Sequence, residues 1–597
     1  MAEQATKTTG AEDVRWQLAE LYASPGDPRI EESLAATIGE ARAFEAAYKG
    51  RIGELASVDF VAMMSRLEDL SDASVRPEMY AQLLHSQDTA DPARGRLLAR
   101  VQEADAERGR HLVFFNLELA DLSDEQVERL LSDPAAARYR HTVEQARKYR
   151  PHNLSETEER LLTDKSPTGA AAWVRLFEEL AAAIKIDLDG QVLGLEHALA
   201  LLRVPDRETR RAATKAITSA LNTDIRTRGY ILNVLLQDKS IDDRLRKYPA
   251  WISSRNLANE TSDEAVEALV AAVTNRYDMV ARYYRVKRRL LGLDQLFEWD
   301  RYAPVAEETR EVGWEDAKEL VLGSYHRFSE RAGRLVGDFF EQPWIDAPTG
   351  PNKRGGAYCM GATPRWHPYV MLNFTGKLND ALTLAHELGH GLHDRLAEGQ
   401  TVFDYHPPLT LAETASVFGE TLTFDRIMAE ERDPKIRLSM LCDQVEGAFA
   451  TVFRQVSMNR FEDAVHRLRR EEGELSTDQL GAVWQEQLQR MFLDSLSLTD
   501  DHRAWWSYVG HFYFAPGYVY AYAYGNLLAL SVYRKYKEVG RSFVDRYLDF
   551  LAAGGSQRPD ELVRTLDMDI TDPEFWDRGL SILDEMVSEI ERLAEPS

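Results

Sequence analysis

Cysteine is scarce in this sequence. Its 597 residues include only Cys359 and Cys442, which lie far apart along the chain. So few cysteines in so long a chain argue against a scaffold held by disulfides and favour a reduced, intracellular protein. We therefore expect a cytoplasmic location.

Long apolar runs are also missing. No segment approaches the roughly 18 to 20 consecutive apolar residues that a membrane span requires. Residues 1–22 contain no apolar stretch of the kind found in a secretory signal. The sequence predicts neither a membrane span nor export.

Positive charge is the third deficit. The chain has 72 Lys and Arg against 98 Asp and Glu, which gives a formal net charge of -26. Phosphate backbones and anionic lipids are bound by basic surfaces, so we expect no nucleic-acid partner and no membrane partner. Solubility is the plain explanation of the acidic charge, and a local acidic cleft that attracts cationic peptides is the alternative, which the net charge alone cannot locate. The oligomeric state does not follow from the composition.

The chain is long and ordinary in composition for a folded protein, with 44% hydrophobic and 28% charged residues. A single core rarely serves so many residues, so two or more lobes are expected. Residues 1–10 are small and polar and are predicted to be disordered. From Asp13 onward a helical spacing of apolar residues begins and recurs along most of the chain.

The texture changes between about residues 345 and 375. Proline and glycine crowd there around two short β-like runs, 357–360 and 369–374. This is the only persuasive strand signal, and residues 187–190 are interpreted as a turn. The sequence predicts an almost all-helical protein with one small sheet.

The segment LAHELGHGLH at residues 384–393 carries the strongest chemical signal. His386 and His390 are four residues apart, so on a helix they share a face and can both reach one tetrahedral zinc ion. Glu387 would lie beside the metal, where its carboxylate could act on metal-activated water as a general base. The alternative is a solvated helix with two surface histidines, but the neighbouring leucines make this helix largely apolar.

A catalytic zinc needs a third protein ligand and one open position. The segment LAETASVFGE at residues 411–420 follows a turn-rich loop and is predicted to be a helix. If the two helices pack antiparallel, Glu413 would face the histidines. Glu420 is the alternative ligand, or it would orient one of the histidines from behind. His393 is predicted to be structural rather than a ligand.

Four longer stretches carry a family resemblance. Residues 367–393, 411–420, 154–180 and 550–576 resemble the thimet oligopeptidase-like zinc metallopeptidases, in particular the oligoendopeptidase F branch. The likeness covers most of the chain after about residue 110. It implies one Zn2+ per chain, bound by His386, His390 and Glu413, with Glu420 as a trailing acid.

The segment HFYFAPGYVYAY at residues 511–522 resembles the aromatic catalytic loop of that family. The resemblance implies that His511, Tyr518 and Tyr522 line the site opposite the zinc, with the spacing of the oligoendopeptidase F branch. Judged by chemistry alone, four tyrosines within residues 518–524 are costly to bury unless their hydroxyls find partners. An aromatic core stripe is the other interpretation.

The resemblance also implies an architecture and an activity. The expected fold is mainly α, a two-lobed helical shell around a deep substrate channel, with one small β-sheet next to the zinc helix. The expected regions are an N-terminal helical extension (1–110), an oligopeptidase F-type N-terminal region (111–200) and a catalytic metallopeptidase domain (201–597). The expected substrates are short unfolded oligopeptides cut at internal bonds. Apart from the resemblance, the short strand 369–374 is expected to pair with the substrate backbone as an added strand.

Two other functions fit the same residues. A zinc carboxypeptidase of related helical fold would need a cationic anchor for the substrate carboxylate. A catalytically inactive peptide-binding scaffold would have no use for the intact Glu387 as a general base.

Overall fold

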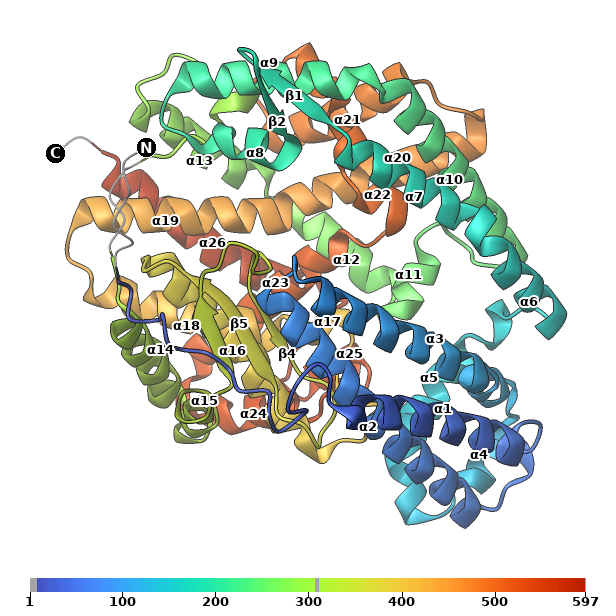
Figure 1. Cartoon of the computed structure of the whole chain (residues 1–597). Helices are drawn as coiled ribbons and strands as arrows, with labels where there is room; N and C mark the ends of the chain where they lie inside the picture. The colour runs from blue at the N-terminus through green and yellow to red at the C-terminus, as the bar shows by residue number, and fades with distance from the viewer. Residues whose placement is uncertain (1–7, 306–310, 596–597) are drawn as a thin grey trace. The chain divides into compact units, whose positions relative to one another are not determined.

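The structure, a computed structural model, describes residues 8–305 and 311–595, and these form two compact units. The first unit comprises residues 1–151, 309–430 and 535–568, and the second comprises residues 152–308, 431–534 and 569–597. Both are built mainly from helices with a small sheet each, which confirms the predicted mainly α class (Figure 1). No helix among the described residues is long and apolar enough to cross a bilayer.

The first unit contains the helices and the three-stranded sheet that frame the predicted metal site. Its elements are α1 (Pro28–Tyr48), α2 (Ser57–Gln87), α3 (Pro92–Asp121), α4 (Asp124–Leu130), α5 (Arg140–Lys148), α14 (Trp314–Phe328), α15 (Glu330–Glu341), β3 (Ile345–Pro348), β4 (Tyr358–Met360), β5 (Tyr369–Phe374), α16 (Leu378–Leu396), α17 (Leu409–Ala412), α18 (Thr414–Glu430), α24 (Val544–Ala552) and α25 (Pro559–Arg564).

The second unit is helical apart from one hairpin. Its elements are α6 (Glu156–Lys165), α7 (Ala170–Ala182), β1 (Lys185–Leu188), β2 (Gln191–Gly194), α8 (Leu195–Ala200), α9 (Arg207–Thr223), α10 (Ile225–Leu245), α11 (Ser253–Ala258), α12 (Asp263–Thr274), α13 (Tyr277–Leu290), α19 (Pro434–Ala448), α20 (Arg454–Glu472), α21 (Thr477–Phe492), α22 (His511–Phe514), most of α23 (Tyr520–Val539) and α26 (Pro573–Leu593).

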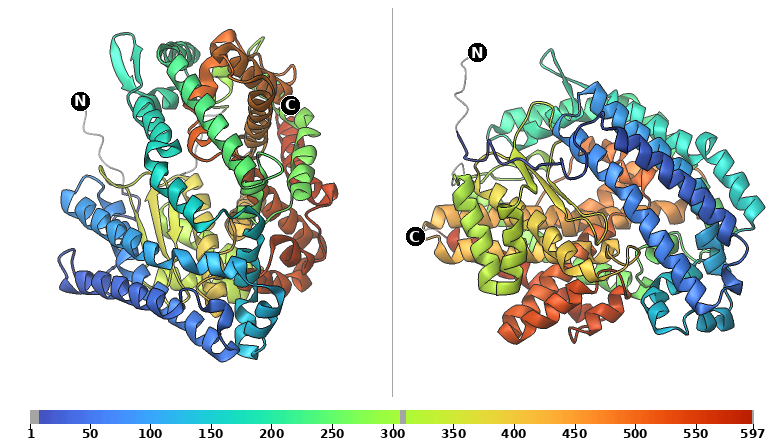
Figure 2. Two further views of the ribbon diagram at one scale, coloured as in Figure 1. Left: turned by 90° about the vertical axis from the view of Figure 1, so that its right-hand side faces the viewer. Right: turned by 60° about the horizontal axis from the view of Figure 1, so that its bottom comes forward.

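Three long helices, α1 to α3, lie side by side at the N-terminal end of the first unit (Figure 2). Aspartates start two of them: Asp27 accepts the N–H of Arg29, and Asp91 accepts the N–H of Ala93, as N-cap residues do. Their facing apolar side chains form one core, and a second core joins this region to Tyr369 and Met371 of β5. The N-terminal helices therefore support the sheet beside the site.

The prediction of a helix from Asp13 is wrong. Residues 12–18 take no helical conformation. Instead the Gln17 N–H donates to the Pro343 carbonyl at 3.0 Å, and the Ala347 N–H donates to the Val14 carbonyl at 2.9 Å. These bonds along β3 replace those of a helix. Residues 1–7, which make up most of the segment predicted to be disordered, lie outside the described residues.

The three-stranded sheet has the order β3-β5-β4. Strand β5 is parallel to β3 and antiparallel to β4, with Val370 opposite both Ile345 and Cys359. Both edges of β5 are thus occupied, so the prediction that residues 369–374 pair with a substrate is wrong. The edge strand that borders the predicted site is β4, which contacts α16 (Figure 1).

A second sheet, β1–β2 in the second unit, was not expected (Figure 2). Its two-residue loop is Asp189-Gly190, and both residues have positive φ, 54° and 84°. Asp-Gly is a strongly favoured pair for such a hairpin turn. The turn was recognised in the sequence, but the two short strands that flank it were not.

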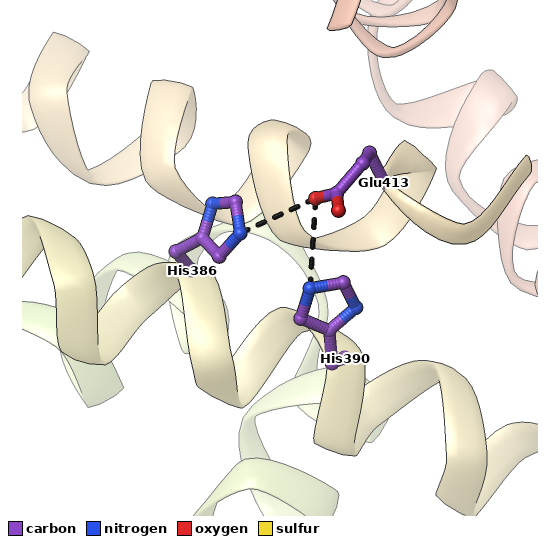
Figure 3. Close-up of side chains that lie close together, drawn as sticks. All are labelled: His386, His390 and Glu413. Atoms are coloured by element: carbon purple, nitrogen blue, oxygen red, sulfur yellow. Dashed lines mark ion pairs between the residues drawn. The ribbon is translucent and has the colours of Figure 1, made fainter. Parts of the chain in front are cut away.

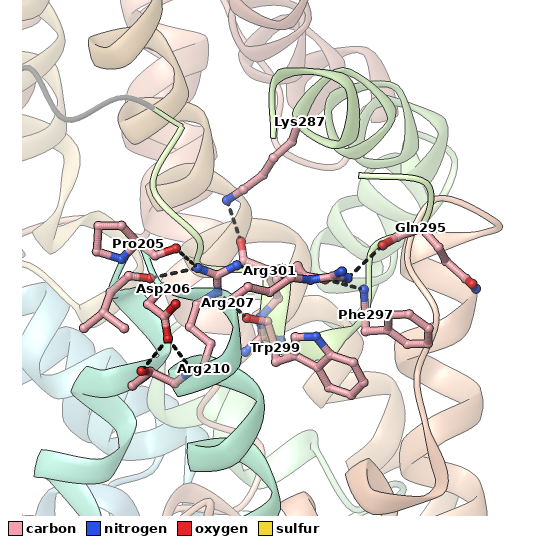
Figure 4. Close-up of polar contacts among 12 residues, drawn as sticks. Pro205, Asp206, Arg207, Arg210, Lys287, Gln295, Phe297, Trp299 and Arg301 are labelled. Carbon is pink, nitrogen blue, oxygen red and sulfur yellow. Dashed lines mark hydrogen bonds and ion pairs between the residues drawn. The ribbon is translucent and has the colours of Figure 1, made fainter. Parts of the chain in front are cut away.

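One buried carboxylate in the second unit is neutralised by two arginines. Asp300 is fully buried and receives hydrogen bonds from Arg207 at 2.7 Å and Arg210 at 3.1 Å. Arg210 also donates to the carbonyls of Pro205 and Trp299 (Figure 4). A buried carboxylate with such partners is satisfied and has no further ligand to recruit.

Candidate metal centre

Helix α16 carries the two predicted histidine ligands, and its sequence explains its position. Asp380 in its first turn accepts the N–H groups of Thr375 and Lys377, which closes the start of the helix. The N-cap position itself is occupied by Lys377. The apolar face of α16 is buried in the first unit.

Helices α16 and α18 pack closely because of a glycine. A Cβ on Gly389 would lie 2.5 Å from the Ala415 carbonyl oxygen and 2.5 Å from the Ser416 Cα, which are backbone atoms that cannot swing aside. Only a residue without a side chain allows this approach. The contact is adjacent to His390 in sequence and holds the start of α18 against α16, which brings Glu413 to the histidines.

The side chains of His386, His390 and Glu413 converge (Figure 3). One Glu413 oxygen, Oε2, lies 3.2 Å from Nε2 of His386 and 3.5 Å from Nε2 of His390. In a tetrahedral zinc site with bonds of 2.0 to 2.1 Å, ligand atoms lie about 3.3 Å apart. Two imidazoles and one carboxylate at these separations fit a catalytic zinc ion, and no other such group of His, Cys, Asp or Glu occurs among the described residues.

Neighbouring groups fix the orientation of the three donors. Glu420, one of the two carboxylates considered as the ligand, lies with Oε2 3.1 Å from Nδ1 of His386, on the ring edge away from Glu413. The Ala412 carbonyl is hydrogen-bonded to His390. The Ser416 hydroxyl donates to Glu413 at 2.7 Å. Such outer partners set the tautomer and angle of metal-binding histidines.

The charges of this cluster are strongly coupled. Burial would lower the pKa of His386, but the carboxylates of Glu413 and Glu420 outweigh it and raise that pKa to about 10. Burial lowers the pKa of His390 to about 4. Burial would raise the pKa of Glu413, but the hydrogen bond from His386 and the electrostatic interaction with His390 outweigh it and lower that pKa to about 2. A single positive charge is thus stabilised among the three donors, where a divalent cation would be more strongly stabilised.

Glu387, the predicted general base, lies on the wall of the same cavity as the donors. Only 7% of the residue is exposed, and burial raises the pKa of its carboxyl group to about 7. The backbone N–H of Cys359 on β4 is hydrogen-bonded to it. A carboxyl group with a pKa near neutrality can both accept and return a proton.

The cavity has a volume of about 400 Å³ and extends along α16 beyond the donors. Cys359, Asp394 and His406 line it, and none of them was singled out in the sequence as a site residue. Asp394 could have been found there, because it lies four residues after His390 and so on the same helix face. His393 is buried and belongs to a different bonding set, since it is hydrogen-bonded to the Leu551 carbonyl.

The predicted aromatic site residues lie in the second unit and form a cluster of their own. His511 Nε2 is 3.2 Å from the Tyr522 hydroxyl, and the rings of His511 and Tyr518 are stacked 5.7 Å apart. The Tyr518 and Tyr522 rings meet edge to face at 5.3 Å. All three side chains are partly exposed.

The alternate tyrosines of this segment are core residues. Tyr520 and Tyr524 are fully buried, and the Tyr520 hydroxyl bonds to Asn256 at 2.7 Å and Asn259 at 2.9 Å. Thr261 donates to the Tyr524 hydroxyl at 3.3 Å. The four tyrosines therefore divide into a satisfied buried pair and a partly exposed pair.

One buried acid holds the loop before Tyr518. Glu462 accepts the N–H of Gly517 at 2.8 Å, and burial raises the pKa of its carboxyl group to about 8. Arg255 lies over the Tyr518 ring at 5.7 Å. Neither residue was predicted, because nothing in the local sequence links residues 255 and 462 to a loop at 517.

The chain matches two family models. The model of Peptidase family M3 matches residues 200–582, and the model described as Oligopeptidase F matches residues 118–186. Among related sequences, Oligopeptidase PepF of Bacillus subtilis is 27% identical over 595 residues, covering 98% of this chain and 87% of its own. Group B oligopeptidase PepB of Streptococcus agalactiae is 27% identical over 540 residues, covering 88% of each chain.

Solved structures share the fold. A chain from Chlamydophila abortus has a TM-score of 0.85 at 23% identity and covers 97% of this chain and 98% of its own. Oligoendopeptidase-F from Enterococcus faecium has a TM-score of 0.72 at 23% identity and covers 94% of this chain and 98% of its own. The helical architecture with small sheets is thus one already seen in experimental structures.

Proposed function

Because this chain belongs to peptidase family M3 and is a metallopeptidase, we propose that it is a zinc metallo-endopeptidase that hydrolyses internal bonds of short unfolded peptides. The observation that carries the proposal is the convergence of His386, His390 and Glu413 beside Glu387 in one cavity. Relatives named oligopeptidases support the class of substrate.

His386, His390 and Glu413 would hold one Zn2+ per chain, with Glu420 orienting His386. When bound, the zinc ion would polarise the scissile carbonyl and lower the pKa of water toward neutrality. The donor separations of 3.2 and 3.5 Å support this set of ligands.

Glu387 would act as the proton carrier. Its carboxylate takes a proton from the attacking water and then delivers that proton to the nitrogen of the departing amine. The hydrogen bond from the Cys359 N–H holds one side of the carboxylate, which keeps the group in a fixed position on the cavity wall.

Tyr518, with Tyr522 and His511, would donate hydrogen bonds to the oxyanion that forms as the carbonyl is attacked. Each such donor is worth about 10² to 10³ in rate. The family resemblance of residues 511–522 supports this role, and so does the partial exposure of the three side chains, whose polar atoms are not locked into the core as those of Tyr520 are.

Peptide backbone would be held at the free edge of β4. This strand is the edge of the sheet on the cavity side, and its residues Tyr358 and Cys359 line the cavity. Adding a strand to an edge gives affinity without requiring a particular sequence. It also requires an extended peptide, which favours unfolded substrates.

Metal analysis combined with peptide cleavage tests this function. Wild type and Glu387→Gln are both expected to contain one zinc per chain, while the variant loses turnover of quenched peptides blocked at both ends by about 10²- to 10⁴-fold. Glu398→Gln, the same change at a surface position after α16, is expected to retain activity.

Three results would contradict the proposal in different ways. Equal activity of wild type and Glu387→Gln would remove Glu387 from the reaction. Cleavage only of peptides with a free carboxyl terminus would indicate a carboxypeptidase. Purified protein that binds no zinc and cuts no peptide would indicate a peptide-binding scaffold.

A further inference from the structure

A carboxylate that accepts no hydrogen bond from the described residues lines the cavity one helical turn beyond the metal donors. Asp394 lies four residues after His390 on α16, and it lines the cavity together with His390, Cys359 and His406. Residues four apart on a helix have Cβ atoms about 5 to 6 Å apart. A peptide residue close to the bond being cut would therefore come within reach of this acid.

No cation among the described residues neutralises Asp394. In the part of the chain that the structure describes, the nearest positively chargeable group is Nδ1 of His406, at 3.9 Å. Nε2 of that ring lies 3.1 Å from the Ala362 carbonyl oxygen and so carries the proton that this oxygen accepts. Nδ1 of a neutral His406 then presents a lone pair to the carboxylate, which gives no attraction.

The adjacent arginine is committed elsewhere. Arg395 pairs with Asp338 at 3.3 Å and with Glu398 at 2.6 Å. Its guanidinium also lies over the Trp344 ring, at 5.3 Å from the centroid. The cation closest in sequence to Asp394 thus cannot serve as its partner without breaking three contacts.

The carboxylate of Asp394 lies close to the backbone at Gly361. A Cβ on Gly361, just after β4, would lie 2.1 Å from Oδ2 of Asp394, so a side chain at residue 361 would displace the carboxylate from its present position. The Asp394 side chain is 12% exposed, and burial raises the pKa of its carboxyl group to about 7. An acid kept in such a place without a partner costs stability unless a ligand supplies the opposite charge.

We propose that Asp394 forms the anionic wall of a subsite that receives a cationic group of the peptide, the side chain of a lysine or arginine or the terminal ammonium group. The inference rests on the proposed function, because it assigns a preference to the same peptide site. Cys359, Gly361 and the ring of His406 beside this wall are uncharged. The other acids of the cavity, Glu387 and Glu413, lie with the metal donors, so Asp394 is the acid that selects the ligand here.

This subsite would discriminate by charge rather than by size. A lysine or arginine that enters it gains a pairing in a poorly solvated place, whereas an apolar side chain of similar length would bury the carboxylate without compensation. We therefore expect peptides with a basic residue at one position near the cut bond to be better substrates than matched neutral peptides by about 10-fold or more.

The test uses quenched peptides with acetylated amino termini in which a single lysine is moved through successive positions, each compared with a norleucine counterpart. A further pair, without lysine, differs only in whether the amino terminus is free. The ratio of kcat/KM for the charged and neutral members of each pair is measured for wild type, Asp394→Asn and the control Glu398→Gln.

Wild type and Glu398→Gln are expected to show the same ratio of about 10 or more for one pair, and Asp394→Asn a ratio near 1. The pair that shows this ratio identifies the cation that enters the subsite, either a lysine at one position or the free amino terminus. The proposal is overturned if wild type prefers the charged member of no pair, or if the preference persists in Asp394→Asn.

A binding measurement separates this proposal from the proposed function. In the Glu387→Gln background, a fluorescent lysine peptide and its norleucine counterpart are titrated by anisotropy with and without Asp394→Asn. Tighter binding of the lysine peptide that requires Asp394 supports the subsite even if no peptide is cut. Equal binding of the two peptides overturns it even if cleavage is efficient. Thermal melting of Asp394→Asn checks that the variant is folded.

Discussion

The metal-donor cluster of the first unit and the aromatic cluster of the second are held by opposite means. His386 and His390 project from α16, and Glu413 projects from the turn between α17 and α18. Hydrogen bonds with a carboxylate, a carbonyl and a hydroxyl hold the three donors. His511, Tyr518 and Tyr522 flank a loop that a buried acid with a raised pKa holds through one N–H. The first arrangement fixes atoms for binding an ion, and the second keeps three aromatic side chains partly exposed.

The largest expected effect concerns the metal-donor cluster. Glu413→Gln should lower zinc affinity by more than the roughly 10- to 100-fold that loss of an outer partner costs, because it removes a donor. Glu420→Gln, the matched change behind His386, should fall within that range. Competition titration with a chromophoric chelator measures both. A weaker effect at Glu413 than at Glu420 would exchange the roles of the two acids.

The next effect tests whether the partly exposed tyrosines differ in function from the buried ones. Tyr518→Phe should lower kcat by about 10² to 10³ with little change in KM, because it removes a donor to the oxyanion. Tyr520→Phe should keep kcat but lose about 1 to 3 kcal/mol of stability, because Asn256 and Asn259 lose a buried partner. Steady-state kinetics and thermal melts distinguish the two. Similar kinetics for both variants would assign Tyr518 to the core.

The smallest effect concerns the acid that holds the aromatic loop. Burial raises the pKa of Glu462 to about 8 in the folded chain, above the ordinary value of 4.5 for this group. Between these values the folded state keeps a proton that the unfolded state has lost, so this group's contribution to stability falls as pH rises toward 8.

Glu462→Gln retains an oxygen for the Gly517 N–H but cannot ionise. Its melting temperature relative to wild type should therefore increase from pH 5 to pH 8, by on the order of 1 °C or more. Melts at several pH values measure the difference. A difference that stays constant over this range would show that Glu462 does not titrate there.

Some features of the metal centre follow from the local sequence, and others depend on how distant helices pack. The spacing of His386 and His390 is local, and helical geometry turns it directly into a shared face. The choice between Glu413 and Glu420 depends on how α16 meets α18, which the backbone contact at Gly389 decides. No periodicity encodes that contact.

The failures have the same origin. The apolar spacing after Asp13 suits a helix, yet that segment bonds along β3 through Val14 and Gln17, and tertiary bonding overrides local preference. Strand β5 was found from its composition, but the central place that keeps it from pairing with a substrate depends on β3 and β4. The hairpin at Asp189-Gly190 needed only its turn signal to be extended to the flanking residues.

The segment around Val14 and Gln17 has a consequence for handling the protein. By bonding to Ala347 and Pro343 it covers the outer border of β3, which would otherwise present unpaired amide and carbonyl groups to other copies. If a protease removes residues 1–17, or if a bulky tag is fused close to this segment, the border of β3 becomes accessible to other copies of the protein. Such preparations should precipitate on concentration even with the metal donors intact.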